Sequence, residues 1–234
     1  MHEKNQLLFT WTGLVSVMLF FIGIFPLAHL LPPPISPLTP VAEVMAFYTE
    51  HHTGILFGEI VILWAAALMI PFFAVIYTQI RRIEGGNPLL ATVFLAASIM
   101  VIMEIIIPAW NFTTVAFREH QSAEITLAFS DQAWIMFVWP NPVTCIFVAS
   151  IGYAILQDRH PDPLFPRWVG FANLLFAVLY LPSTFTTLFY TGPMAWNGLF
   201  AFWFPAGEFG IWFFIMFFVL RRAIRRDYHP PVEA

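Results

Sequence analysis

Long apolar stretches alternate with short polar segments along the whole chain. A helix of about 20 predominantly apolar residues is long enough to cross a bilayer. Six stretches meet this requirement, at about 7–31, 54–80, 88–110, 132–156, 168–190 and 198–220. We therefore expect an all-α fold: a polytopic membrane protein built as a six-transmembrane-helix bundle, with residues 1–234 forming a single membrane domain.

The first span and the segment after it allow two further predictions. The first apolar run is longer than the central region of a signal peptide, which has about 7–15 residues, so we expect a permanent helix. After it, "LPPPISPLTP" ends the span. Thr39 can then cap a helix that has Pro40 in its first turn. We expect this amphipathic helix, at about 40–50, to lie on the outer surface of the membrane.

Lys and Arg are distributed unevenly between the two sides that six spans define. Only Arg118 falls on one side, and nine residues share the other side with both termini: Lys4, Arg81, Arg82, Arg159, Arg167, Arg221, Arg222, Arg225 and Arg226. Cytoplasmic loops carry an excess of Lys and Arg. The pattern predicts cytoplasmic termini and a multi-pass protein of the bacterial cytoplasmic (inner) membrane.

Composition agrees with a membrane protein. The chain is 59% hydrophobic and 10% charged, whereas soluble domains are about 45–50% apolar and about 25% charged. A net charge of -4 argues against a nucleic-acid partner. The single cysteine, Cys145, excludes an internal disulfide and the thiolate metal clusters that need several cysteines.

Three carboxylates lie inside the spans: Glu59, Glu104 and Glu208. Each costs about 2.5–3.5 kcal/mol at the bilayer centre on insertion scales, so such residues mark functional sites by default. Counted at about 1.5 Å per helical residue, all three fall in a similar layer on the outer side. We expect them to meet in one outward-facing site, as a protonatable centre and as the candidate catalytic groups.

Other polar and aromatic residues are expected in the same zone. Polar side chains recur at helical spacing in the fifth span, and deep tryptophans flank Glu208; both features favour a lined cavity over a lipid-facing surface. Beside the three glutamates, the candidate ligand-binding residues are Asn111, Asn141, Tyr180, Thr184, Trp203 and Trp212.

Two alternative interpretations of these residues remain open. The glutamates can act only as interhelical hydrogen-bonding groups. A metal site is the other alternative, because imidazole and carboxylate suit Zn, Fe or Cu. The candidate metal ligands are His29, His52, Glu59, Glu104 and Glu208. The seven-residue spacing of His52 and Glu59 is not a known ligand signature, and no nucleotide-binding or hydrolase motif is present.

Several segments carry a family resemblance. "FPRWVGFANLL" followed by "TGPMAWNGLFAFWFP", together with "AFYTEHHTGI" and "RRIEG", resembles a pattern found in a family of bacterial polytopic inner-membrane proteins with no assigned activity. The resemblance extends over most of the chain. It implies a bacterial inner-membrane location and carries no functional residues over to this sequence.

Three functional hypotheses follow. The first is an aromatic-walled intramembrane carboxylate site that binds or moves a small lipophilic molecule, alone or coupled to proton movement. The second is a membrane-embedded enzyme, acid/base or metal-dependent, that acts on a lipophilic substrate. The third is an accessory subunit of a larger membrane complex, with a partner protein or a second copy of the chain. All three have the lipid bilayer as a partner.

Overall fold

The structure, a computed structural model, describes residues 2–33, 35–118 and 121–226. Within these ranges every regular element is helical, and six helical segments are long and apolar enough to cross a membrane, which confirms the expected fold class. The elements are α1 (His2–Ile22), η1 (Gly23–Leu27), α2 (Val41–Glu84), α3 (Leu89–Ala116), α4 (Ala123–Val138), α5 (Asn141–Gln157), α6 (Arg167–Tyr180), η2 (Leu181–Leu188), η3 (Leu199–Trp203) and α7 (Phe204–Ile224).

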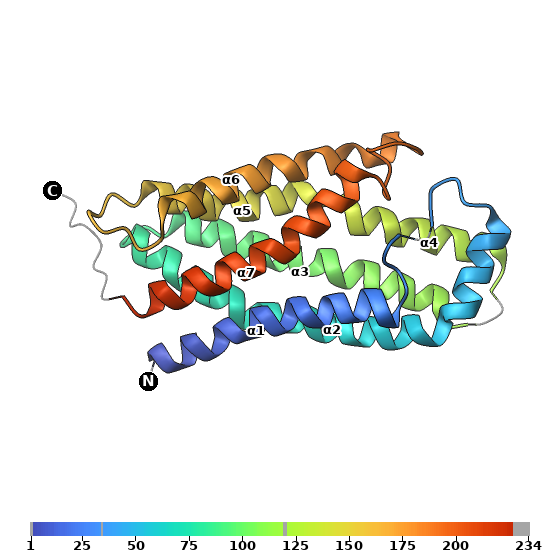
Figure 1. The fold of residues 1–234 in the computed structure, drawn as a ribbon, viewed down its shortest axis with the longest axis horizontal. Helices are drawn as coiled ribbons and strands as arrows, with labels where there is room; N and C mark the ends of the chain where they lie inside the picture. Colours follow the sequence, from blue (N-terminus) through green and yellow to red (C-terminus); the bar gives the residue numbers. More distant parts are fainter. Residues whose placement is uncertain (1, 34, 119–120, 227–234) are drawn as a thin grey trace.

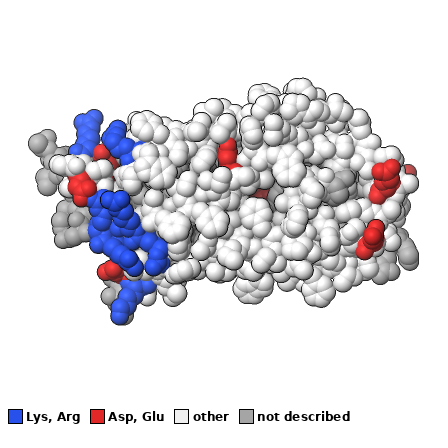
Figure 2. Space-filling model, viewed as in Figure 1, with Lys and Arg blue, Asp and Glu red and all other residues white. Residues whose placement is uncertain are grey.

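The helices run up and down along one long axis, and the start of α1 and the end of α7 lie at the same end of the bundle (Figure 1). α1 packs against α2 and α7, α3 packs against α2, α4 and α5, and α6 packs against α5 and α7. Lys and Arg gather at the end that holds the start of α1 and the end of α7, which we call the basic end (Figure 2). The opposite end, which we call the acidic end, holds the first turns of α2 and α4, with Glu43 and Glu124, and acidic side chains are visible there in Figure 2.

Irregular helical turns make the observed segments differ from the expected spans. The first helix finishes in a π-helical turn, η1, that contains Pro26, and residues 28–31 lie beyond it. Residues 41–50 are helical, but they form the first turns of α2 and cross the acidic end at a steep angle to the rest of that helix (Figure 1). The fourth expected span is divided into α4 and α5 at Trp139 and Pro140.

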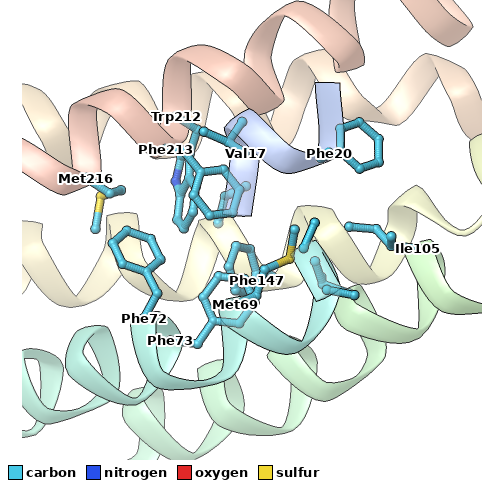
Figure 3. Close-up of a cluster of buried hydrophobic side chains, with 14 of the residues drawn as sticks. Val17, Phe20, Met69, Phe72, Phe73, Ile105, Phe147, Trp212, Phe213 and Met216 are labelled. Carbon is cyan, nitrogen blue, oxygen red and sulfur yellow. The ribbon is translucent and has the colours of Figure 1, made fainter. Parts of the chain in front are cut away.

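An aromatic cluster fills the centre of the bundle (Figure 3). Phe72 stacks on Phe213 with ring centroids 5.4 Å apart, and Phe147 lies 5.3 Å from Trp212. The ring centroid of Phe73 lies 5.0 Å from that of Phe147, 6.2 Å from that of Trp212 and 6.3 Å from that of Phe213. Aromatic pairs of this geometry contribute about 0.5–1.5 kcal/mol each beyond burial, so this cluster fixes α2, α5 and α7 relative to one another.

Small residues bring the first two spans into close contact. A Cβ atom built on Gly58 of α2 would lie 2.5 Å from the backbone oxygen of Gly23 in η1. A little further along, the hydroxyl of Ser16 donates a hydrogen bond to the backbone oxygen of Ala65, at 2.7 Å. Small residues and hydroxyl groups of this kind are typical of helix–helix contacts in membranes.

Polar contacts tie the helices together at the basic end. Both carboxylate oxygens of Glu84 accept hydrogen bonds from backbone N–H groups in the first turn of α3. The guanidinium of Arg82 donates to Gln79 and to the backbone oxygens of Ala223 and Arg226. These hydrogen bonds hold the end of α2 to the start of α3 and to the end of α7.

Candidate functional site

A cavity of about 100 Å³ lies between the two halves of the bundle. Its walls are mostly apolar and aromatic, and they come from α1, α3, α4, α5, α6, η3 and α7. The polar residues among them are Glu104, Asn141, Thr144 and Tyr180; the apolar ones are Phe20, Phe21, Leu31, Val101, Ile105, Phe137, Val138, Ala201, Phe202, Pro205, Ala206 and Phe209. Acidic atoms are visible midway along the otherwise uncharged body (Figure 2).

Glu104 is the acidic residue of this cavity. Its Oε2 atom accepts a hydrogen bond from the hydroxyl of Thr144, at 2.5 Å, which links α3 to α5. Its Oε1 atom is buried and has no hydrogen-bond partner among the described residues. Oε2 is therefore bonded to the protein, whereas Oε1 can accept a hydrogen bond from a molecule that enters the cavity.

Asn141 and Tyr180 are held by their own neighbours on the opposite wall. The Asn141 side-chain amide donates to the backbone oxygen of Val138, at 2.9 Å, and to the hydroxyl of Ser183, at 2.6 Å. Ser183 in turn donates to the backbone oxygen of Tyr180. This chain of hydrogen bonds fixes the start of α5 against the end of α6.

Irregular backbone surrounds the cavity. The 3-10 turn η2 follows Tyr180, the π-helical turn η3 precedes Pro205, and the α4–α5 break precedes Asn141. Proline lacks a backbone N–H and cannot continue a regular helical ladder. π-helical turns occur frequently at functional sites. The departures from regular helix in these spans thus open space beside Glu104 where straight helices would pack.

Glu208, one turn into α7, lies next to the cavity without lining it. Its side chain is buried, and both carboxylate oxygens lack a hydrogen-bond partner in the described part of the chain. Three residues close to it in sequence, Pro205, Ala206 and Phe209, do line the cavity. The backbone of α7 around Glu208 therefore borders the cavity, although the carboxyl group itself does not line it.

Glu59 lies at a separate, smaller cavity of about 10 Å³, near the lower limit for one water molecule. The residue is only 2% exposed, and neither of its oxygens has a hydrogen-bond partner among residues 2–33, 35–118 and 121–226. Phe20, Ile105 and Phe137 line both cavities. The structure therefore places Glu59 behind a hydrophobic partition and not in one shared pocket with Glu104.

Four other candidate residues do not line the main cavity. The indole N–H of Trp212 donates to Asn173, at 2.9 Å, and its ring belongs to the aromatic cluster. Asn111 donates to the backbone oxygen one turn earlier in its own helix. The Thr184 hydroxyl is buried in η2, and Trp203 is 44% exposed on the surface of the bundle.

The two candidate histidine ligands make contacts with other groups. His29 has a left-handed backbone conformation, with φ of 55°, and its ring lies 4.8 Å from that of His51. His52 makes local contacts with the backbone oxygen of Thr49 and the hydroxyl of Thr53. No group of three or more His, Cys, Asp or Glu residues in the described ranges is arranged to hold a metal ion. The geometry does not bring the candidate metal ligands together.

The structure also adds residues that sequence reasoning missed. Thr144 is the most important, because it holds Glu104 from another helix. It lies three residues after Asn141 and therefore on the same face of α5, a signal that the sequence contains. Phe20, Phe137, Phe202 and Phe209 form the aromatic walls, and nothing in the sequence separates them from the other phenylalanines.

No protein-family model, no curated protein and no solved structure matches this chain. The resemblance to bacterial inner-membrane proteins therefore stays a prediction. By the length and composition of its helices, the chain is a multi-pass membrane protein, with a buried aromatic cluster and buried carboxyl groups at Glu59 and Glu208.

Proposed function

We propose that this membrane protein binds a small lipophilic molecule in the cavity beside Glu104, and that the molecule carries at least one hydrogen-bonding group. The observation that supports this proposal most strongly is the Oε1 atom of Glu104, which is buried without a partner among the described residues at the wall of an aromatic cavity. Buried polar atoms are nearly always hydrogen-bonded, and a bound molecule supplies the missing partner here.

The residues that line the cavity indicate the size and the apolar character of the bound molecule. Most lining residues are apolar or aromatic, as in known small-molecule sites, where a few polar groups fix the orientation of the ligand. The cavity volume of about 100 Å³ is somewhat below the ~150 Å³ of an engineered cavity that holds benzene. A single small ring or a branched end group of a larger molecule suits this space.

The surroundings support an outward-facing site. Arg81, Arg82, Arg221 and Arg222 at the basic end mark the cytoplasmic side by the positive-inside rule, which puts the acidic end outside the inner membrane. Leu31, which follows the outer end of the first span, lines the cavity. Glu208 is a second buried carboxyl group, and its sequence neighbours Pro205, Ala206 and Phe209 line the cavity. Its position supports the part of the proposal in which binding of the molecule is coupled to proton movement.

The direct test is photolabelling in lipid nanodiscs with a short-chain primary alcohol that carries an alkyl diazirine, a probe small enough for a space of about 100 Å³. We expect labels on cavity residues such as Phe137 and Phe209, identified by peptide mass spectrometry. Glu104→Gln should reduce this labelling about tenfold, the loss expected for a hydrogen bond to a charged group. The same change at an exposed residue of the acidic end, Glu124→Gln, serves as the control. Cavity labelling that is equal in wild type and Glu104→Gln would refute the proposal.

A further inference from the structure

A second hollow, which we call the surface groove, lies on the outside of the bundle beside the cavity. It has a volume of about 440 Å³. All of its lining residues are apolar: Phe21, Ile22, Phe25, Pro26, Leu31, Pro32 and Trp203. Ile22, Phe25 and Trp203 are 44%, 55% and 44% exposed. In a helix bundle with an uncharged body (Figure 2), such a groove faces hydrocarbon.

The surface groove and the cavity share two lining residues, Phe21 and Leu31. Both are only partly buried, so they form the partition between the two spaces. The ring of Phe21 rests against α7 at a position without a side chain: a Cβ atom built on Gly210 would lie 3.3 Å from it. These two side chains therefore separate the groove from the space beside Glu104, and the two spaces would join if the side chains turned aside.

Irregular helix forms both walls of the surface groove. Phe25 and Pro26 belong to the π-helical turn η1, and Trp203 ends the π-helical turn η3. The residue before Trp203, Phe202, lines the cavity. Since neighbouring residues of one π-helical turn face the groove and the cavity, the same local distortion produces both spaces.

We infer that the surface groove holds the hydrocarbon chain of a single-chain amphiphile whose polar end group lies at Glu104, and that this molecule enters sideways from the bilayer between η1 and η3. The inference rests on the proposed function and names its ligand class. A wall shared with a carboxylate-bearing cavity distinguishes this groove from the rest of the lipid-facing surface, where a hydrocarbon chain finds no polar group to anchor its end. The end group is small and donates a hydrogen bond, as an alcohol or amine does, because Oε1 of Glu104 is an acceptor without a partner among the described residues.

Two photoactivatable probes separate this inference from the proposed function. The short probe is the short-chain alcohol with an alkyl diazirine, and the long probe is a long-chain primary alcohol with a diazirine in its chain. Both are used in nanodiscs at one fixed ratio of probe to lipid. The variant is Trp203→Ala, which removes a groove wall outside the cavity, and the matched control is Trp64→Ala, another exposed tryptophan of a span.

We expect the long probe to label residues 22–26 in wild type. Trp203→Ala should reduce this labelling about fivefold, as expected for the loss of one aromatic contact, and Glu104→Gln should reduce it as well. Trp64→Ala should leave it unchanged. Cavity labelling by the short probe should persist in Trp203→Ala, which also shows that the variant is folded.

Three results overturn the inference. Groove labelling that does not depend on Glu104 would show ordinary lipid contact, and an equal effect of the two tryptophan variants would show a general change of partitioning. A groove residue crosslinked to a second copy of the chain would assign the groove to an oligomer contact. If the short probe still labels the cavity in a Glu104-dependent manner, the proposed function survives these failures; if it does not, the proposed function fails with them.

Discussion

Replacing Thr144 by Val removes the hydroxyl group that holds Glu104 in place while keeping the shape of the side chain. In the structure this hydroxyl donates to Oε2 of Glu104 at 2.5 Å, from α5 to α3. The other oxygen, Oε1, already lacks a partner in the described part of the chain. The variant therefore leaves a largely buried carboxyl group with neither oxygen bonded to the protein.

The size of the effect follows from two ranges. Hydrogen bonds to charged groups contribute about 1.5–3 kcal/mol in soluble proteins, whereas hydrogen bonds between membrane helices average about 0.6 kcal/mol with a maximum of about 1.7 kcal/mol. The Thr144–Glu104 hydrogen bond is short, and the other carboxylate oxygen of Glu104 has no partner among the described residues. We therefore expect a loss of stability in the upper part of the membrane range, about 1–1.5 kcal/mol. In a protein of this size that lowers the melting temperature by roughly 2–6 °C.

Thermal unfolding in detergent, followed by tryptophan fluorescence, measures this change. Thr144→Ser, which retains the hydroxyl, is the control and should melt close to wild type. A double-mutant cycle of Thr144→Val with Glu104→Leu isolates the pair, and we expect a coupling free energy of about 1 kcal/mol. Additive effects of the two substitutions would refute the assignment of Thr144 as the residue that holds Glu104.

Three further predictions concern stability, each measured by the same thermal assay. Gly58→Ala should destabilise the protein by about 1–3 kcal/mol, because its Cβ atom would lie 2.5 Å from the backbone oxygen of Gly23. Gly207→Ala, which has open space around it, should not destabilise the protein, and equal melting temperatures of the two variants would contradict this contact. Glu59→Met should raise the melting temperature, because it replaces a buried carboxyl group without a partner among the described residues by an apolar side chain; a lower melting temperature would point to a partner for that carboxyl. Glu84→Ala should cost about 1–2 kcal/mol through loss of the α3 cap, and an unchanged melting temperature would argue against the cap.

Hydropathy and charge are sufficient to predict the six-helix architecture, because bilayer thickness fixes the length of each span. The same reasoning identifies Glu59, Glu104 and Glu208 as unusual. It does not fix the rotation of each helix about its axis, and rotation decides which residues share a cavity. For this reason the sequence does not reveal that Phe20, Ile105 and Phe137 separate the cavity at Glu59 from the cavity at Glu104.

Local backbone irregularity and side-chain pairing explain the other differences. The π-helical turns η1 and η3 shift the side chains beyond them, so a regular helical wheel misplaces Trp203. The sequence predicts Trp212 as a residue of the cavity wall. In the structure its indole N–H donates a hydrogen bond to the side-chain oxygen of Asn173 in α6, and its ring lies in the aromatic cluster. Such a pairing forms only where two helices meet. The spacing of residues within one helix does not predict it.

The most direct test of the central claim is native mass spectrometry of the protein released from nanodiscs made with its native membrane lipids. If the cavity beside Glu104 holds a small lipophilic molecule, wild type should carry an additional mass that collisional activation removes, and the extracted molecule should contain a hydrogen-bonding end group. Glu104→Gln should lose this mass, and Glu124→Gln should keep it. Identical spectra for wild type and Glu104→Gln, with or without a bound mass, would contradict the account.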